Sequence, residues 1–446
     1  MQRTLLFTLA VWAAGVAFAA DRVAPAIAPP LADHHQHLQS PATAALANRT
    51  APEIAVPPAI ATLLRERERV WNDASGLRKL FTGDAQVFTG ANPGWADAAR
   101  GAGYLSSRFA RPYRLTPTTL RMRDAQATIG GYYTRGEGAD TSRIGYFQLV
   151  LERDAHDAWR IASEVPVFPG PTMSKVEDAR DLIRYLDEAG IRRAVVLSNA
   201  YYFDSPKNDV TDRREKVRRE NDWTAAQVAA FPDRLVAFCS FNPLAEWAIE
   251  ELERCADSGG FTGIKLHFGT SAVDLRNPAH VEKVRAVVAA ANRRGMPLIV
   301  HVRTDPKNYG AEDARVLLER IVSAAPDVTF QIAHLWGGEA FSADALQVYA
   351  EAVARGDPVA RHLYFDLAEA ALVVGDRPDV ADAVVRRMRQ IGLDRILYAT
   401  DGPVEESQTP ADGWKATQKL PLTAEELRRI ARNLAPYLAK RPKPLK

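Results

Sequence analysis

The second half of the chain repeats one pattern of apolar and polar positions. Short apolar runs rich in β-branched residues end in polar residues, and an amphipathic helix follows each run. Near-continuous apolar strands that alternate with helices predict a parallel sheet covered on both faces. The predicted strands are residues 30–38, 193–198, 235–241, 263–268, 297–302, 329–334, 363–367 and 395–401. Eight such units predict an α/β fold, a (β/α)8 TIM barrel with its active site at the C-terminal strand ends. A doubly wound parallel sheet is the alternative.

The residues between the first two predicted strands follow a different pattern. Residues 59–81 have helical spacing, and side chains then alternate in a way that predicts antiparallel strands. These strands are expected at residues 86–89, 118–122, 127–134, 143–153 and 159–165. Prolines border this region on both sides. We therefore expect an inserted α+β domain after strand 1, and a chain divided into residues 1–20 (leader), 30–50 with 171–440 (barrel) and 51–170 (insert).

Three signals mark the ends of predicted helices. Ser174 with Glu177, and Thr423 with Glu426, have the spacing of a capping box, which predicts that a helix begins there. Gly190 follows the first of these helices and predicts its end.

The first 20 residues have the pattern of a secretory signal peptide. Arg3 precedes an apolar run over 4–18, and Ala17 and Ala19 form a small-x-small cleavage site. The run is shorter than the ~20 residues that span a bilayer. We expect an exported, periplasmic protein without stable membrane association once the leader is removed. An uncleaved membrane anchor is the alternative.

Charge and cysteine content narrow the function classes. The chain has 57 Lys+Arg against 55 Asp+Glu, and this near-zero balance disfavours a nucleic-acid partner. Two cysteines in 446 residues exclude a disulfide scaffold and a cysteine-built zinc site. Cys239 and Cys255 fall on a predicted strand and the following helix. They could pair in an oxidising compartment, but we expect two buried thiols.

The first predicted strand ends in a pair of histidines with metal-ligand spacing. His35 and His37 are two residues apart, so their side chains share one face of the strand and can bind one cation. By the same alternation His34 should point away. Neutral imidazole suits zinc, and a catalytic zinc site needs about three protein ligands and an open position.

Other predicted strands end in residues of the same chemical kind. His301, His334 and Asp401 each close an apolar strand, where a buried imidazole or carboxylate would need a partner. Lys265 and His267 share one face of the fourth strand and could also point into the barrel mouth. Arg303 and Trp336 follow strand ends and are candidates for contact with a substrate.

At these residues the sequence resembles the amidohydrolase superfamily, in its amidohydrolase-2 (decarboxylase-like) branch. The matching segments are DHHQH at 33–37, FPDRLVAFCSFNP at 231–243, GFTGIKLHF at 260–268, PLIVHV at 297–302, IAHLWGG at 332–338, ATDGP at 399–403 and LTAEELRRIARNLAPYL at 422–438. Thr400 replaces the serine that usually precedes the aspartate, and the large insert is unusual. The insert is similar to the NTF2-like or SnoaL-like fold, which leaves ligand binding and a structural or dimerising role open.

The resemblance implies a role for each candidate residue. His35, His37, His301 and Asp401 would surround one divalent metal ion, with zinc expected and manganese or iron as alternatives. His334 would orient the attacking water or the substrate. A second metal would need a bridging group, for which a carboxylated Lys265 is the one candidate.

A bound divalent cation lowers the pKa of its water towards ~7. Asp401 would accept the water proton, and His334 would donate a hydrogen bond to the developing oxyanion. The sequence therefore predicts metal-dependent hydrolysis of an amide, lactone or ester-like small molecule. A decarboxylase of the same branch and a non-catalytic periplasmic binding protein are the alternatives. The substrate and the oligomeric state, with a homo-oligomer among the options, stay open.

Overall fold

The computed structural model describes residues 27–47, 53–70, 73–88, 95–97, 114–135, 142–167, 176–304, 309–338, 340–375, 377–402 and 409–439. The predicted leader and Ser174 lie outside the described residues.

Eight parallel strands form one sheet in which each strand pairs with the next along the chain. The strands are β1 (Ala32–His37), β8 (Arg193–Leu197), β9 (Leu235–Ser240), β10 (Gly263–His267), β11 (Leu298–His301), β12 (Phe330–Ile332), β13 (Leu363–Asp366) and β14 (Ile396–Leu397). This sequential order confirms the TIM barrel and excludes the doubly wound sheet. Backbone hydrogen bonds also join the two ends of the sheet: His34 N donates to Tyr398 O (3.0 Å), and Asp401 N donates to His35 O (2.9 Å).

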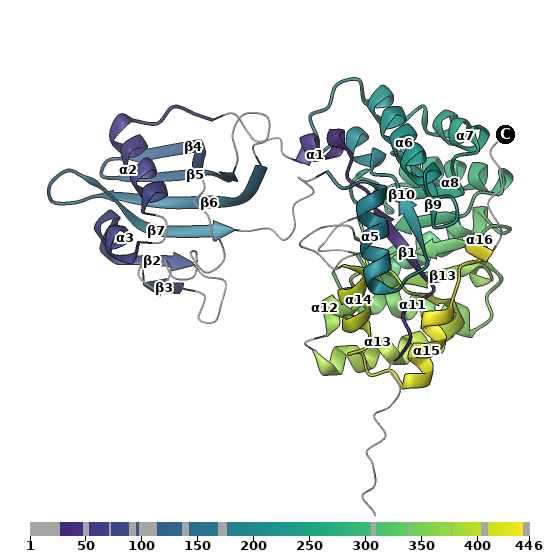
Figure 1. The fold of residues 1–446 in the computed structure, drawn as a ribbon. Helices are drawn as coiled ribbons and strands as arrows, with labels where there is room; N and C mark the ends of the chain where they lie inside the picture. The colour runs from purple at the N-terminus through teal and green to yellow at the C-terminus, as the bar shows by residue number, and fades with distance from the viewer. Residues whose placement is uncertain are drawn as a thin grey trace, which may run out of the picture.

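Helices follow the strands and pack around the barrel (Figure 1). The longer ones are α5 (Ala179–Ala189), α6 (Arg213–Ala229), α7 (Ala248–Ser258), α8 (Pro278–Arg293), α11 (Ala343–Ala354), α13 (Pro378–Ile391) and α15 (Ala424–Arg432). Shorter ones are α1 (Pro41–Ala47), α9 (Ala311–Val316), α10 (His334–Gly337), α12 (Ala370–Val374), α14 (Pro410–Thr417) and α16 (Pro436–Ala439), with a 3-10 turn η2 (Ala200–Asp204). Apolar side chains of the strands and helices form one large core, and a smaller cluster joins side chains of the strands to α16. Each fully buried Leu, Ile or Val contributes about 1.5–3 kcal/mol.

Two of the three predicted helix ends are confirmed, and one is wrong. The capping box of Thr423 and Glu426 is present at the start of α15, and Gly190 ends α5 in the left-handed conformation at φ 69°. The predicted capping box of Ser174 and Glu177 does not begin α5, because the helix starts at Ala179. Glu177 pairs through its backbone with Gln39 just after β1, which keeps it extended, so Asp178 caps the helix instead.

The inserted region forms a second, mixed sheet of six strands in the order β3-β2-β7-β6-β5-β4. These are β2 (Phe81–Phe88), β3 (Trp95–Asp97), β4 (Arg114–Arg123), β5 (Gln126–Arg135), β6 (Ser142–Arg153) and β7 (Trp159–Val167). Figure 1 shows this sheet with its helices as a lobe beside the barrel. The domain does lie between strands β1 and β8, as predicted. The sheet is mixed rather than fully antiparallel because β2 runs parallel to β7.

The single helix predicted over 59–81 is wrong. The structure has α2 (Pro58–Arg69) and a separate α3 (Ala74–Leu80), and Phe81 already begins β2. The break has a local cause, because the Asp73 side chain accepts a hydrogen bond from Ser75 N (3.0 Å) and caps a new helix.

One ion pair is buried in the core of the inserted domain. Arg67 of α2 donates two hydrogen bonds to Glu164 of β7, from Nε and Nη2, at 3.1 Å each. The Tyr133 hydroxyl donates to the same carboxylate at 2.6 Å. Arg67 is 1% exposed and Glu164 is fully buried, so this interaction ties helix to sheet away from water.

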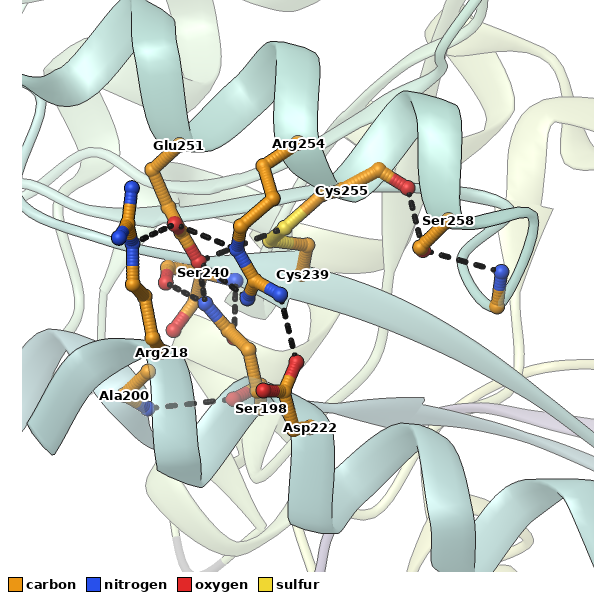
Figure 2. The surroundings of a disulfide bond; sticks show 12 residues. Ser198, Ala200, Arg218, Asp222, Cys239, Ser240, Glu251, Arg254, Cys255 and Ser258 are labelled. Atoms are coloured by element: carbon orange, nitrogen blue, oxygen red, sulfur yellow. Dashed lines mark hydrogen bonds and ion pairs between the residues drawn. A yellow bond between two sulfur atoms is a disulfide. The ribbon is translucent and has the colours of Figure 1, made fainter. Parts of the chain in front are cut away.

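The expected pair of free thiols is also wrong. Cys239 of β9 and Cys255 of α7 form a disulfide, with their Cα atoms 6.3 Å apart. The physical reason is that α7 packs back over the strand it follows, which brings its buried face against Cys239 (Figure 2). Beside the disulfide, the buried Glu251 carboxylate accepts from Arg254 Nε (2.9 Å) and Asn221 Nδ2 (2.9 Å).

Among the described residues, no helix has both the length and the apolar character needed to cross a membrane.

We expect the Glu164→Gln substitution to destabilise the inserted domain by about 3–5 kcal/mol, because it removes the carboxylate charge that balances the buried Arg67 guanidinium. Hydrogen exchange of the full chain, read on peptides of β5 to β7, measures this loss of protection. The Glu53→Gln variant is the control, since its partner Arg114 is exposed and such pairs contribute about 0–1 kcal/mol. Equal protection in the two variants would contradict the prediction.

Replacing Cys239 and Cys255 together by alanine should lower the free energy of unfolding by about 3 kcal/mol. The disulfide closes a loop across a sequence separation of 16 residues and restricts the unfolded chain. Denaturant unfolding of oxidised and variant protein measures the difference, and alkylation in denaturant without reductant counts free thiols, because both cysteines are buried in the folded chain. Two reactive thiols in protein purified without reductant would refute the disulfide.

Candidate metal centre

The site lies where the C-terminal end of β1 meets the chain that follows β14. Alternation along β1 turns His35 and His37 into the barrel, as the sequence predicted. His34 points the other way: its Nδ1 lies 3.0 Å from Tyr398 O, and its Nε2 accepts from Ala435 N (3.2 Å). The backbone bond from Asp401 N to His35 O then fixes Asp401 next to the histidine pair.

Three imidazole nitrogens converge on the Asp401 carboxylate. His35 Nε2 lies 3.0 Å and His37 Nε2 3.3 Å from Asp401 Oδ1, and His334 Nε2 lies 3.6 Å from Asp401 Oδ2. The candidate ligand atoms of His35, His334 and Asp401 all lie within 4.8 Å of one another. Four of the five residues predicted to share one site are therefore together.

Each of these three histidines is held at its other nitrogen. His37 Nδ1 lies 2.9 Å from Leu197 O, and His334 Nδ1 lies 3.2 Å from Ala368 O. A carbonyl oxygen only accepts, so both Nδ1 atoms carry hydrogen and both Nε2 lone pairs face Asp401. His35 Nδ1 lies 3.2 Å from a carboxylate oxygen of Asp366. Acceptors that hold Nδ1 while Nε2 points inward are the usual outer shell of a metal-binding histidine.

The charge states suit a divalent cation. Burial lowers the pKa of His37, and it lowers the pKa of His334 to about 4, so both rings are neutral at pH 7. Burial alone would raise the pKa of Asp401, but the histidines outweigh it and hold that pKa well below its usual range. Burial and Lys265 lower the pKa of His35, yet Asp401 and Asp366 outweigh both and raise it to about 9. A cation bound at His35 Nε2 would therefore displace a proton.

Two of the site residues have strained backbones. His334 has φ 55° and Asp401 has φ 65°. Leu335, the residue after His334, also has a positive φ of 60°. Non-glycine residues with positive φ are uncommon, and each costs about 1–3 kcal/mol unless the surroundings compensate. Such strain concentrates at functional sites, and here it aims His334 and Asp401 at each other.

Lys265 and His267 of β10 both lie at the mouth, as their shared parity predicted. Lys265 is buried, and its Nζ lies 3.0 Å from His35 Nε2. The His267 ring stacks on His301, with centroids 3.9 Å apart and planes 19° apart. Tyr201 of η2 packs on the other side of His267 at 4.9 Å.

His301 lies beside the centre rather than among the atoms that converge on Asp401. Its ring is edge-on to His334 at 5.2 Å and stacked on His267. Its assignment as a metal ligand stays a prediction.

Arg303 and Trp336 pack below the mouth. Arg303 donates from Nη1 to Ala340 O, and its side chain lies against the backbone of Gly338. Trp336 is fully buried and edge-on to Phe341 at 5.1 Å. These contacts favour packing over substrate contact for both residues, and their proposed substrate role stays a prediction.

Three residues near the site were not singled out from the sequence. Asp366 ends β13 and touches two of the site histidines. Asp33 is fully buried and accepts from Thr400 Oγ1 (2.6 Å) and Gln36 Nε2 (2.7 Å). Tyr201 lies between His37 and His267. Asp366 carried the signal of a polar residue at a strand end, whereas Asp33 and Tyr201 carried no comparable signal.

The donor set fits a divalent first-row metal ion. Imidazole nitrogens with one carboxylate suit zinc, iron and similar ions, and a catalytic site leaves one position open. His35, His37 and Asp401 are the residues that would hold such an ion, with His334 and the predicted ligand His301 next to them.

The chain is similar to known proteins of one family. The sequence profile of the family described as Amidohydrolase matches residues 172–433. The chain is 24% identical over 274 residues to a gamma-resorcylate decarboxylase of Rhizobium sp. (strain MTP-10005), covering 54% of this chain and 81% of the relative. It is 26% identical over 273 residues to a protein of the same name from Polaromonas sp., with the same coverage.

Solved structures of similar proteins include two 5-carboxyvanillate decarboxylases. The enzyme of Sphingomonas paucimobilis has a TM-score of 0.40 at 16% identity, over 58% of this chain and 80% of that one. The enzyme of Novosphingobium aromaticivorans, solved with bound manganese, has a TM-score of 0.43 at 19% identity, over 60% and 83%.

The profile match covers more than half of the 446 residues and includes β8 to β14, the strands that complete the barrel around β1. The chain belongs to the amidohydrolase family, in the amidohydrolase-2 branch of TIM-barrel proteins.

Proposed function

We propose that the protein is a metal-dependent decarboxylase of a small carboxylic acid, with a hydroxylated aromatic acid as the first candidate. The observation that carries this proposal is the convergence of three imidazole Nε2 atoms on Asp401, with the Lys265 ammonium beside them. The related sequences named as decarboxylases support this reaction over the hydrolysis that the sequence alone favoured.

The reaction exchanges a carboxylate for a proton. The bond between the ring carbon and the carboxylate breaks, its electron pair stays on the ring carbon, and a proton must reach that carbon as carbon dioxide leaves. A divalent ion at this centre would bind an oxygen of the substrate and withdraw electron density from it.

Asp401 and His334 are placed to supply the proton. Their nearest side-chain atoms are 3.6 Å apart, which is beyond a direct hydrogen bond. The free site holds no proton between them, so the proton would be taken up from water and carried by one of these two groups to the ring carbon. General acid catalysis needs the donor within hydrogen-bond reach of the accepting atom. Lys265 offers a cationic partner for the substrate carboxylate before it leaves.

We further propose that the protein is exported to the periplasm after loss of residues 1–20. The disulfide of Cys239 and Cys255 supports this, because such bonds persist in oxidising compartments. We also propose an NTF2-like fold for residues 51–170, supported by helices packed on a six-stranded sheet. For the whole protein we propose a small molecule as the substrate and association with further copies of the same chain.

A substrate screen tests the reaction. Protein loaded separately with zinc, manganese or iron(II) is incubated with 2,6-dihydroxybenzoate, 5-carboxyvanillate and other hydroxybenzoates, and released carbon dioxide is measured. A parallel panel of lactones, amides and esters tests hydrolysis. Turnover of the second panel alone would overturn the decarboxylase proposal. A protein that binds ligands but turns over neither panel would favour a binding protein.

Removal of the metal should abolish turnover and leave the barrel folded. The protein is dialysed against a strong chelator, and activity is followed as each divalent ion is returned. We expect recovery to saturate at one ion per chain, counted by elemental analysis. Full activity in protein shown to be metal-free would contradict a role for the metal.

The Asp401→Asn substitution should lower kcat at least about 100-fold, because it removes both the charge and the proton carrier. The amide has nearly the same shape, and the backbone bond to His35 is unaffected, so the fold should persist. The Asp187→Asn variant is the control, since this exposed residue pairs with Arg234 at the N-terminal end of the strands. If Asp401→Asn retains wild-type kcat, the proton assignment is wrong.

A further inference from the structure

We propose that Asp366 is the positioning residue of the metal centre, which selects His35 Nε2 as the ligand atom and holds His334 in its strained turn. This inference rests on the proposed metal site but not on which reaction the protein catalyses. Asp366 is the last residue of β13 and is fully buried.

Each oxygen of Asp366 serves one of the two histidines. Oδ2 lies 3.2 Å from His35 Nδ1, and it also accepts from Gln331 Nε2 at 2.7 Å. Oδ1 accepts from the backbone N–H of His334 (2.9 Å) and of Ala368 (3.2 Å). Four donors therefore point at one carboxylate, so an amide NH2 group in place of either oxygen would oppose at least one of them.

The contact with His35 sets the tautomer of its ring. A carboxylate favours hydrogen on Nδ1, which leaves the Nε2 lone pair for a cation. Lys265 Nζ, a donor 3.0 Å from Nε2, agrees with this direction. Asp401 Oδ1 also lies 3.0 Å from Nε2 but only accepts, so it favours hydrogen on Nε2 until a cation takes that place.

The contact with His334 compensates for an unfavourable backbone. His334 and Leu335 have φ of 55° and 60°, and the bond from His334 N to Asp366 Oδ1 enters that turn at its first residue. The same turn directs His334 Nε2 to Asp401. One buried carboxylate thus orients two of the predicted ligating or catalytic side chains.

A second chain of contacts holds Asp366 itself. Gln331 of β12 donates to Oδ2 and accepts from the hydroxyl of Tyr437, which belongs to the C-terminal helix α16. Asp366 therefore has little freedom to turn away from His35.

The Asp366→Asn variant tests the proposal, because no orientation of the amide satisfies all four donors. With its NH2 group towards His35, Nδ1 must accept and Nε2 becomes protonated, which blocks a cation. With its NH2 group towards the turn, it opposes the backbone N–H groups of His334 and Ala368. We expect zinc affinity, measured by competition with a chromophoric chelator, to fall about 10- to 100-fold.

The Glu220→Gln variant is the matched control. Glu220 is also a buried carboxylate of the barrel, but its partners are the hydroxyls of Ser40 and Thr43, which a glutamine can still bond. We expect its zinc affinity to stay within a factor of two of wild type. Wild-type affinity in Asp366→Asn, or an equal loss in both variants, would overturn the proposal.

A measurement on the unmodified protein covers the case in which Asp366→Asn fails to fold. Nitrogen-15 spectra of histidine-labelled, zinc-loaded protein report which nitrogen of each ring carries hydrogen, and a His35→Gln sample assigns the His35 signals. We expect hydrogen on Nδ1 and metal on Nε2. Metal on Nδ1 would overturn the proposal, whatever the enzymatic activity of the sample.

Discussion

The closure of the barrel between its first and last strands is the constraint on which the site depends. Asp33 and Thr400 bond side chain to side chain across this seam, and Asp401 follows directly. Burial raises the pKa of Asp33 to about 6, against the effect of its hydrogen bonds. The buried Asp33 carboxyl group therefore holds the first strand to the residues that follow the last strand. If β1 slipped by one residue against β14, His35 and His37 would exchange faces with His34 and Gln36, and no histidine pair would face Asp401.

Two further sets of contacts position the site residues once the barrel is closed. Backbone carbonyls of Leu197 and Ala368 orient His37 and His334, and strained residues close the distance to Asp401. The barrel core supplies the stability that makes such strain tolerable, because strained conformations persist only where the surroundings over-determine them. The chemistry is thus assembled from three strand ends, those of β1, β12 and β14.

Much of this arrangement could be predicted from the sequence, and the failures have physical causes. Apolar strands that end in His or Asp are a local pattern, so His35, His37, His334 and Asp401 were found. Asp366 shows the same pattern, but a single carboxylate inside an apolar run is equally typical of a satisfied core residue. The bond between Asp33 and Thr400 joins residues 367 positions apart, and only the register of the closed barrel creates it.

Other errors came from competition between local and tertiary effects. Asp73 interrupts a helical pattern because its side chain caps a new helix more favourably than it would continue the old one. Glu177 was displaced from its expected cap by pairing with Gln39. The pairing of the cysteines depends on which face of α7 meets β9, and the hydropathy of either element alone does not specify this.

The position of the insert has a consequence for the order in which the molecule can form. β1 leaves the ribosome early, yet His37 meets its first barrel partner 160 residues later, at Leu197, and Asp33 meets Thr400 only after 367. The inserted domain has its own core, so it can fold before β1 has its barrel partners. Contacts over such separations form slowly, so we expect the metal centre to be assembled late in folding. A metal ion would then bind only chains with a closed barrel, and its binding energy would stabilise the closed barrel relative to incompletely folded chains.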